Sequence, residues 1–194
     1  MERLPTEERR RQIAEAALRI IAEKGLRKFT IAAISDEVGL ADGTIFRHFE
    51  DKDDIVLEAV NRLGELLGEQ TPPTEGDPLE RLEELLTQRV ELISRRPELV
   101  KLLFSDDLIK AGPEEAAKRV RNLKQMSMQF ILHLLREADD EGMLREGAEP
   151  EELLPVIHGT ALAMVFSGDE LEEVTGSAAP GRVWKTVSGL IRRS

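Results

Sequence analysis

The segment from Phe29 to Lys52, FTIAAISDEVGLADGTIFRHFEDK, restricts the possible folds of this chain more than any other part of it. Thr30 is a good helix N-cap, because its hydroxyl can accept a backbone N–H of the next turn. The apolar residues behind it recur on one helical face: Ile31, Ile34 and Val38. Gly39 stands where a helix needs a left-handed C-terminal residue, and a second helical pattern follows, with Ile45 and Phe49 four residues apart.

Two short helices joined by so tight a turn form a helix-turn-helix, whose second helix enters the major groove of DNA. We expect the first helix from about Thr30 to Val38 and the second from about Asp42 to Phe49. Ser35 is small enough for the point where the two helices approach closely. This segment by itself therefore predicts a DNA-binding protein.

Residues from about 10 to 56 resemble the N-terminal domain of the tetracycline-repressor (TetR) family of transcription regulators. The residues that carry the resemblance are Ala16, Ala17, Phe29–Thr30, Ile34, Val38–Gly39–Leu40, Gly43–Thr44–Ile45–Phe46, His48–Phe49 and Lys52. The run GTIFRHFEDK after the turn makes the resemblance specific. It covers about a quarter of the chain, and the remainder resembles the family only in its helical layout.

The net charge of −11 is unusual for a DNA-binding protein, but it is unevenly distributed. Residues 1–52 carry ten Lys or Arg and ten Asp or Glu, whereas the other 142 residues carry 17 and 28. Within the neutral segment the basic residues cluster at Arg9–Arg10–Arg11, Arg27–Lys28, Arg47–His48 and Lys52. An acidic body would repel DNA from every other face.

Composition favours an all-α protein of the cytoplasm. Aromatic residues make up 4% of the chain and Tyr is absent, which argues against a sheet-rich fold. The absence of Cys excludes disulfides, thiolate metal sites and cysteine nucleophiles. No apolar signal segment opens the chain, and its longest nearly apolar run, Val156 to Phe166, is too short to span a bilayer. Three dispersed histidines form neither a metal-binding spacing nor a Ser-His-Asp grouping, so we expect no metal, no cofactor and no enzyme.

Helical spacing continues to the end of the chain and predicts about nine helices. We expect a helix-turn-helix domain at residues 1–52 and a larger C-terminal regulatory and dimerisation domain at residues 53–194. A fourth helix at about residues 51–68, capped by Asp51, connects the two domains. Pro150 opens an apolar helix that Pro155 should kink, unless Pro155 marks its true start.

Eight residues are expected to face DNA: Thr30, Asp42, Gly43, Thr44, Phe46, Arg47, His48 and Lys52. The hydroxyls of Thr30 and Thr44 and the ammonium group of Lys52 suit phosphate oxygens. Gly43 lets the backbone come near the strand. The bases at Arg9–Arg10–Arg11 either reach phosphates or form a solvated helix end.

The second helix carries the residues that could read sequence. Arg47 can bind a guanine edge or a phosphate. Asp42 repels phosphate, so it either accepts from a cytosine amine or, as we favour, caps the helix. The resemblance implies that His48 bonds a phosphate, and that Phe46 replaces a Tyr and so removes a phenolic contact.

The C-terminal half contains candidates for an adaptable apolar cavity, which would suit a hydrophobic ligand such as an acyl chain or a drug. They are Phe104, Met126, Phe130, His133, His158, Leu162, Met164 and Phe166. Each can also be ordinary core. In that alternative, His133 forms a surface pair with Glu137 and His158 is a satisfied interior imidazole.

The last two predicted helices, opened by Pro150 and Pro180, carry more apolar surface than the rest of a monomer could cover. We expect them to pair with their copies across a two-fold axis as a four-helix interface, or else to close a monomeric core. The interface residues would be Ile157, Ala161, Val165, Val183, Trp184, Val187, Leu190 and Ile191.

The function expected from the residues and the resemblance is transcriptional regulation. The protein would bind a palindromic operator as a homodimer, repress transcription and release the DNA when a small molecule binds its C-terminal domain. The alternative is a DNA-binding regulator without such an effector, either constitutive or controlled by a protein partner.

If Asp42 lies on the DNA face, Asp42→Lys should tighten non-specific binding and steepen its salt dependence, since one more phosphate would be neutralised. DNA binding measured over a series of salt concentrations tests this. An unchanged salt slope would place Asp42 off the DNA face.

Overall fold

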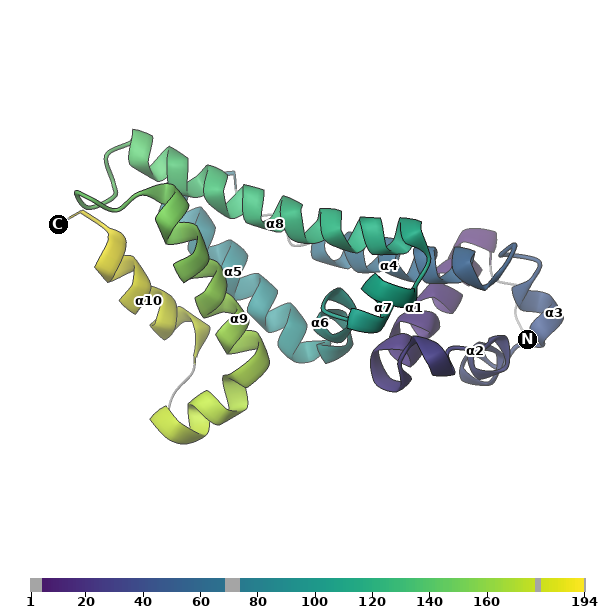
Figure 1. Ribbon diagram of the computed structural model, residues 1–194. Helices are drawn as coiled ribbons and strands as arrows, with labels where there is room; N and C mark the ends of the chain where they lie inside the picture. The colour runs from purple at the N-terminus through teal and green to yellow at the C-terminus, as the bar shows by residue number, and fades with distance from the viewer. Residues whose placement is uncertain (1–4, 69–73, 177–178, 194) are drawn as a thin grey trace. The chain divides into compact units, whose positions relative to one another are not determined.

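The computed structural model describes residues 5–68, 74–176 and 179–193, and the chain in these ranges is built from helices (Figure 1). They are α1 (Thr6–Lys24), the 3-10 turn η1 (Leu26–Lys28), α2 (Ile31–Val38), α3 (Asp42–Ile45), α4 (Lys52–Gly68), α5 (Pro78–Arg95), α6 (Pro97–Leu103), α7 (Asp106–Ala111), α8 (Glu114–Asp140), α9 (Pro150–Thr175) and α10 (Pro180–Ile191). The prediction of an all-α fold is confirmed. The short helix α7, which Ser105 caps by accepting from the Leu108 N–H at 3.2 Å, was not predicted.

The chain divides into two compact units. Unit 1 consists of residues 1–69 and 96–124, and unit 2 of residues 70–95 and 125–194. Helix α8 therefore contributes residues to both units. The division predicted between residues 52 and 53 concerns function rather than compactness, and it stays a prediction.

Helix α1 is the centre of unit 1, where it packs against α2, α4 and α6. The apolar stripes of α1 and α4 are buried: Ile13, Ala16, Ala17, Ile20 and Ile21 on α1, and Ile55, Ala59, Leu63, Leu66 and Leu67 on α4. Each large side chain among them contributes about 1.5–3 kcal/mol to stability by leaving water. The predicted helix-turn-helix is thus held by a core that α1 and α4 complete.

Helix α2 begins and ends as its sequence predicts. The Thr30 hydroxyl accepts a hydrogen bond from the Ala33 N–H at 3.1 Å, which caps the helix. Gly39 has φ 68° and ψ 38°, and the N–H groups of Gly39 and Leu40 both donate to the Ser35 carbonyl. This left-handed residue reverses the chain within a single turn, so that α3 can begin at Asp42.

Helix α3 is shorter than predicted, because regular helix ends at Ile45 rather than at Phe49. The chain continues in hydrogen-bonded turns, and the N–H groups of His48 and Phe49 both donate to the Ile45 carbonyl, at 2.9 and 3.1 Å. Both Ile45 and Phe49 remain buried. The shortening therefore leaves the apolar face of the segment in the core.

Unit 2 is built around α5, which contacts α9 and α10. Its core contains Leu79, Leu82, Leu85, Ile131, Leu134, Leu135, Ala138, Leu144, Ile157, Trp184 and Ile191. Helix α9 begins at Pro150, so Pro155 lies inside it and is not its start, and the backbone departs from helical dihedrals at Ser167 (φ −133°, ψ 24°). Pro155 cannot donate to the Glu151 carbonyl, but both residues are exposed and water can replace that bond.

Gly39→Ala should lower the free energy of unfolding by about 1–2 kcal/mol, because a Cβ is unfavourable in the left-handed conformation. Gly43→Ala is the matched control, since Gly43 has no positive φ and an added Cβ would meet no atom within 4 Å. That variant should be as stable as the original chain or more stable by up to about 1 kcal/mol. Urea unfolding followed by circular dichroism measures both. Equal stability of the two variants would contradict the role given to Gly39.

Candidate DNA-binding surface and effector cavity

The segment that begins with α3, residues 42–49 (the α3 segment), has some side chains in the core and others in solvent. Ile45 and Phe49 are buried, whereas the six predicted DNA-contacting residues are exposed or half-buried: Asp42, Gly43, Thr44, Phe46, Arg47 and His48. The ring of Phe46 is 52% exposed, which leaves an apolar group on a polar surface. Such a group can contact the methyl of thymine in the major groove.

Two further predicted contacts, Thr30 and Lys52, are also exposed. The lone pair of the Thr30 hydroxyl accepts the capping bond, so its own hydrogen can still be donated to a phosphate oxygen. Lys52 begins α4, and its Nζ lies 5.4 Å from the centre of the Phe29 ring. The Asp54 N–H donates to the Asp51 carboxylate at 2.9 Å, which confirms Asp51 as the cap of α4.

Arg10 fastens the end of the α3 segment to the rest of unit 1. Its guanidinium donates to the His48 carbonyl and lies 4.2 Å from the centre of the Phe49 ring. The same group is 3.8 Å from the Asp54 carboxylate and 3.6 Å from that of Glu58, both on α4. Arg10 thus links α1, the α3 segment and α4 through one charged group.

The three consecutive arginines of α1 have different environments. Arg9 is buried and donates to Gln12, and Arg10 is engaged as described, so neither is placed to reach a phosphate. The suggestion that Arg9–Arg10–Arg11 contact DNA is therefore wrong for the first two. Arg11 is exposed, and for it the suggestion stays a prediction.

Asp42 is the first residue of α3, behind the N-cap residue Ala41, and no side-chain hydrogen bond caps this helix. Asp42 therefore favours the helix N-terminus by its charge, and whether it also contacts DNA stays a prediction. His48 has its Nδ1 buried without a hydrogen-bond partner, and its contact with phosphate stays a prediction.

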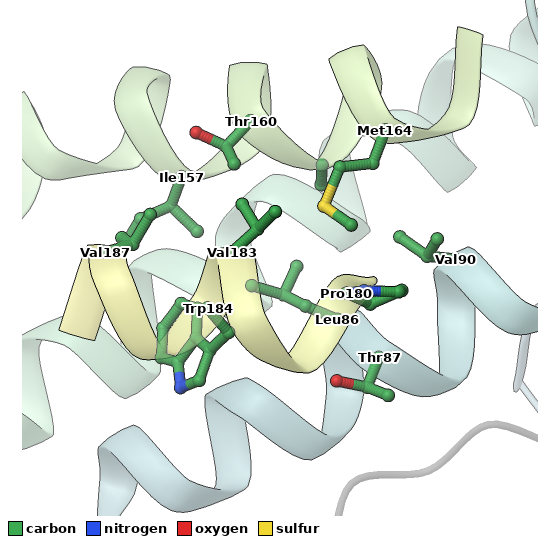
Figure 2. Close-up of a pocket in the computed structure, with 11 residues that line it drawn as sticks. Leu86, Thr87, Val90, Ile157, Thr160, Met164, Pro180, Val183, Trp184 and Val187 are labelled. Carbon is green, nitrogen blue, oxygen red and sulfur yellow. The ribbon is translucent and has the colours of Figure 1, made fainter. Parts of the chain in front are cut away.

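A small apolar cavity lies in unit 2, enclosed by α5, α9 and α10 (Figure 2). Its lining residues are Leu86, Thr87, Val90, Ile157, Thr160, Ala161, Met164, Pro180, Val183, Trp184 and Val187. The enclosed volume is about 20 Å³, which is room for one water molecule. An apolar ligand could enter only if side chains such as Met164 moved.

Of the residues predicted to line a ligand cavity, Met164 alone belongs to this lining. Met126 and Phe166 are more than half exposed, and His133 is an exposed residue with its Nε2 3.5 Å from the Glu137 carboxylate, so these three do not line a cavity. Phe104 belongs to unit 1, where the Lys124 ammonium lies 4.1 Å from its ring centre. The remaining three are partly buried in unit 2: Phe130, His158 and Leu162.

The predicted dimer-interface residues mostly face the core of their own unit. Ile157, Trp184 and Ile191 are buried in that core, so in this structure they are not accessible to a second copy. Four are half-buried: Ala161, Val165, Val183 and Val187. Only Leu190, 61% exposed, is largely accessible.

Arg89 is a residue that the sequence analysis missed. It lies on α5 four residues after Leu85 and four before Ile93, at the helical spacing of these apolar residues. Its guanidinium donates to the Ser127 hydroxyl on α8, and its Nε is buried without a partner. Burial lowers the pKa of Arg89. A basic residue at a core-facing position of an amphipathic helix is the signal that could have revealed it.

Within the described ranges, no group of three or more His, Asp or Glu side chains could hold a metal ion. None of the helices in these ranges is both long and apolar enough to cross a bilayer. A capped helix, a left-handed glycine turn and a second helix with solvent-facing side chains define a helix-turn-helix protein.

Comparison with known proteins identifies the family. Residues 13–59 match the model described as "Bacterial regulatory proteins, tetR family". Residues 78–179, more than half of the chain, match "Tetracyclin repressor-like, C-terminal domain". The chain therefore belongs to the TetR family, and it is a DNA-binding transcriptional regulator.

Similar proteins extend over most of the chain. The regulator YvkB of Bacillus subtilis is 24% identical over 164 residues, which cover 83% of this chain and 85% of YvkB. The structure of the ketosteroid transcriptional regulator KstR2 of Mycobacterium tuberculosis has a TM-score of 0.69 and 21% identity, covering 96% of each chain. AibR, solved with isovaleryl coenzyme A and operator DNA, has a TM-score of 0.72 and 18% identity, covering 94% of this chain and 97% of AibR. The TM-scores of these two structures show that the fold is shared.

Proposed function

We propose that the protein is a repressor that binds a palindromic operator as a homodimer and is released by a small hydrophobic ligand. The observation that carries the DNA-binding part is the exposed α3 surface, whose end Arg10 fastens to α1 and α4. Arg47 is the candidate for base reading, and Thr30, Thr44 and Lys52 are candidates for phosphate contacts. Residues 1–52 would read DNA, and residues 53–194 would regulate.

The dimer part rests on an exposed apolar stripe of α9. Val156 and Phe166 are 54% and 52% exposed, and Gly159 and Ala163 lie exposed between them at spacings of three and four residues. These four residues share one helical face, opposite the face that Ile157 buries. A stripe that combines large apolar groups with small residues suits a second copy of the same helix across a two-fold axis.

A dimer determines the geometry of the operator. Two copies of α3 can read successive major-groove faces only if they lie roughly 34–36 Å apart, or a multiple of it. A ligand that prefers a protein state with another spacing would release the DNA. A decisive shift between two such states takes about 5.5 kcal/mol of differential binding.

Helix α8 is the candidate for carrying this change. Its N-terminal part packs on α4 in unit 1, where a Cβ on Gly64 would lie 3.1 Å from Leu123. So close an approach leaves little room for α8 to move without moving α4. Because α8 continues into unit 2, a ligand that displaced it there would act through α4 on the helix-turn-helix formed by α2 and α3.

The ligand class is inferred from the apolar cavity of unit 2 and from the relatives. AibR was solved with isovaleryl coenzyme A, and KstR2 is a ketosteroid transcriptional regulator. For this chain the cavity must open before it admits any such molecule. Its small volume is also the observation that favours the second candidate, a regulator without a small-molecule effector.

Selection of bound duplexes from a random DNA pool should yield a palindromic or nearly palindromic site. Arg47→Ala should relax the preference at one position of each half-site and cost about 1–3 kcal/mol per contact. Lys52→Ala is the control: it should weaken all sequences alike and reduce the salt slope. A selected site without symmetry would count against the dimer, and an unchanged base preference in Arg47→Ala would remove Arg47 from base reading.

Ala163→Glu should convert the dimer to a monomer, because the carboxylate would be buried at the two-fold axis. Ala111→Glu, at the exposed end of α7, makes the same chemical change outside the stripe and should stay dimeric. Sedimentation velocity at micromolar concentration distinguishes the two states, and circular dichroism checks the helical content. A dimeric Ala163→Glu variant would place the interface elsewhere.

A further inference from the structure

Arg89 is a largely buried cation without an anionic partner in the described residues. The hydrogen bond from its guanidinium is to the neutral hydroxyl of Ser127, and its Nε, inaccessible to solvent, has no partner. No carboxylate of the described part of the chain forms an ion pair with it. Burial lowers its pKa, and no charged neighbour opposes that effect.

Two other partly buried arginines, Arg62 and Arg81, are paired with carboxylates, whereas the Nε of Arg119 in unit 1 is, like that of Arg89, buried without a partner. Arg62 lies 2.9 Å from the carboxylates of Glu15 and Glu65. On α5 itself, Arg81 lies 3.0 Å from the Glu137 carboxylate. An unpaired buried charge is strongly unfavourable, whereas an anion that reaches it removes much of that cost. Arg89 therefore differs from Arg81, two turns earlier on the same helix, in lacking this compensation.

His158 extends the same cluster from α9. Its side chain is half-buried, and its pKa is lowered first by burial and then by the positive charge of Arg89. The imidazole is therefore favoured in its neutral form, in which one nitrogen donates a hydrogen bond. Three helices of unit 2 thus bring together a guanidinium, a hydroxyl and an imidazole.

We infer that Arg89, Ser127 and His158 form a binding site for an anionic group, a carboxylate or a phosphate, of the effector. A guanidinium presents two parallel N–H donors that match either group, and the hydroxyl and imidazole can add one bond each. This inference rests on the proposed function, and it specifies the ligand as an amphiphile rather than a purely apolar molecule.

The apolar surroundings of the cluster suit the remainder of such an amphiphile. Val90 follows Arg89 on α5, Ile157 precedes His158 on α9, and both line the apolar cavity. The anionic group would thus be fixed by the Arg89 cluster while the apolar chain occupies the interior of unit 2. A neutral molecule with the same chain would leave the guanidinium uncompensated.

Titration calorimetry on the full chain with decanoate, decyl phosphate and 1-decanol tests the site, since the three share one chain and differ in the head group. At least one anion should bind about tenfold or more tightly than decanol. Arg89→Met should remove that preference and leave decanol binding unchanged. The matched variant Arg81→Met should keep it. The two anions distinguish a carboxylate from a phosphate ligand.

The melting temperature of the free variants gives a second readout. Arg89→Met should melt at or above the temperature of the original chain, because it removes a partly buried charge that has no ion pair, whereas Arg81→Met removes the 3.0 Å ion pair with Glu137 and should melt lower. The inference would be overturned by any of three results: no binding of the decyl compounds, an equal affinity for decanol, or an anion preference that survives in Arg89→Met. A destabilised Arg89→Met would also count against it.

A measurement of whether the protein stays bound to the selected operator DNA, made with the same samples, distinguishes this inference from the proposed function. If decanoate binds through Arg89 but does not release the operator, the anion site stands and the effector mechanism fails. If the original chain does not bind duplex DNA at low salt, the proposed function fails whatever the calorimetry shows.

Discussion

The direction in which α3 leaves α2 depends on the backbone of one residue, Gly39. Its left-handed conformation lets two successive N–H groups close on the Ser35 carbonyl, so the chain reverses without an unsatisfied helix end. Only from that direction can Ile45 and Phe49 enter the core that α1 and α4 form. The exposed positions of α3 follow from this constraint, since burying one face leaves Asp42, Gly43, Phe46 and Arg47 in solvent.

Charge has two different uses in unit 1. The guanidinium of Arg10 stabilises the structure: it donates a hydrogen bond to the His48 carbonyl and forms ion pairs with Asp54 and Glu58. Arg47 and Lys52 are exposed and form no ion pair with the described residues, although the Nζ of Lys52 lies 5.4 Å from the centre of the Phe29 ring. A DNA-binding helix-turn-helix needs both charges that hold its structure and charges that remain exposed. Without the first, the second would not be held in a defined orientation.

In unit 2, an exposed apolar stripe and a partly buried arginine suit partners from outside the monomer. The stripe of α9 that contains Val156 and Phe166 is apolar and exposed, and Arg89 has a buried Nε without a hydrogen-bond partner and no ion pair within the described residues. Each is unfavourable for an isolated chain. A second copy of the chain would remove the first cost, and an anionic ligand would remove the second. Such departures from an optimal monomer are expected where a protein binds something.

Local rules determined a large part of this protein. Capping by Thr30 and Asp51, the left-handed Gly39 and the apolar stripes of α1 and α4 are all properties of neighbouring residues, and they led directly to a helix-turn-helix and an all-α fold. These features could be predicted because a helix end or an amphipathic face is specified within a few residues.

Tertiary structure alone decided which side of a nearly all-apolar helix meets the core. In α9 the sequence does not mark one face, so Ile157 was assigned to the dimer interface although it is buried against its own unit. The partners of Arg10 lie 38 to 48 residues away, and the lining of the cavity comes from three helices. Such contacts depend on the packing of distant segments, and periodicity within one segment carries no information about them.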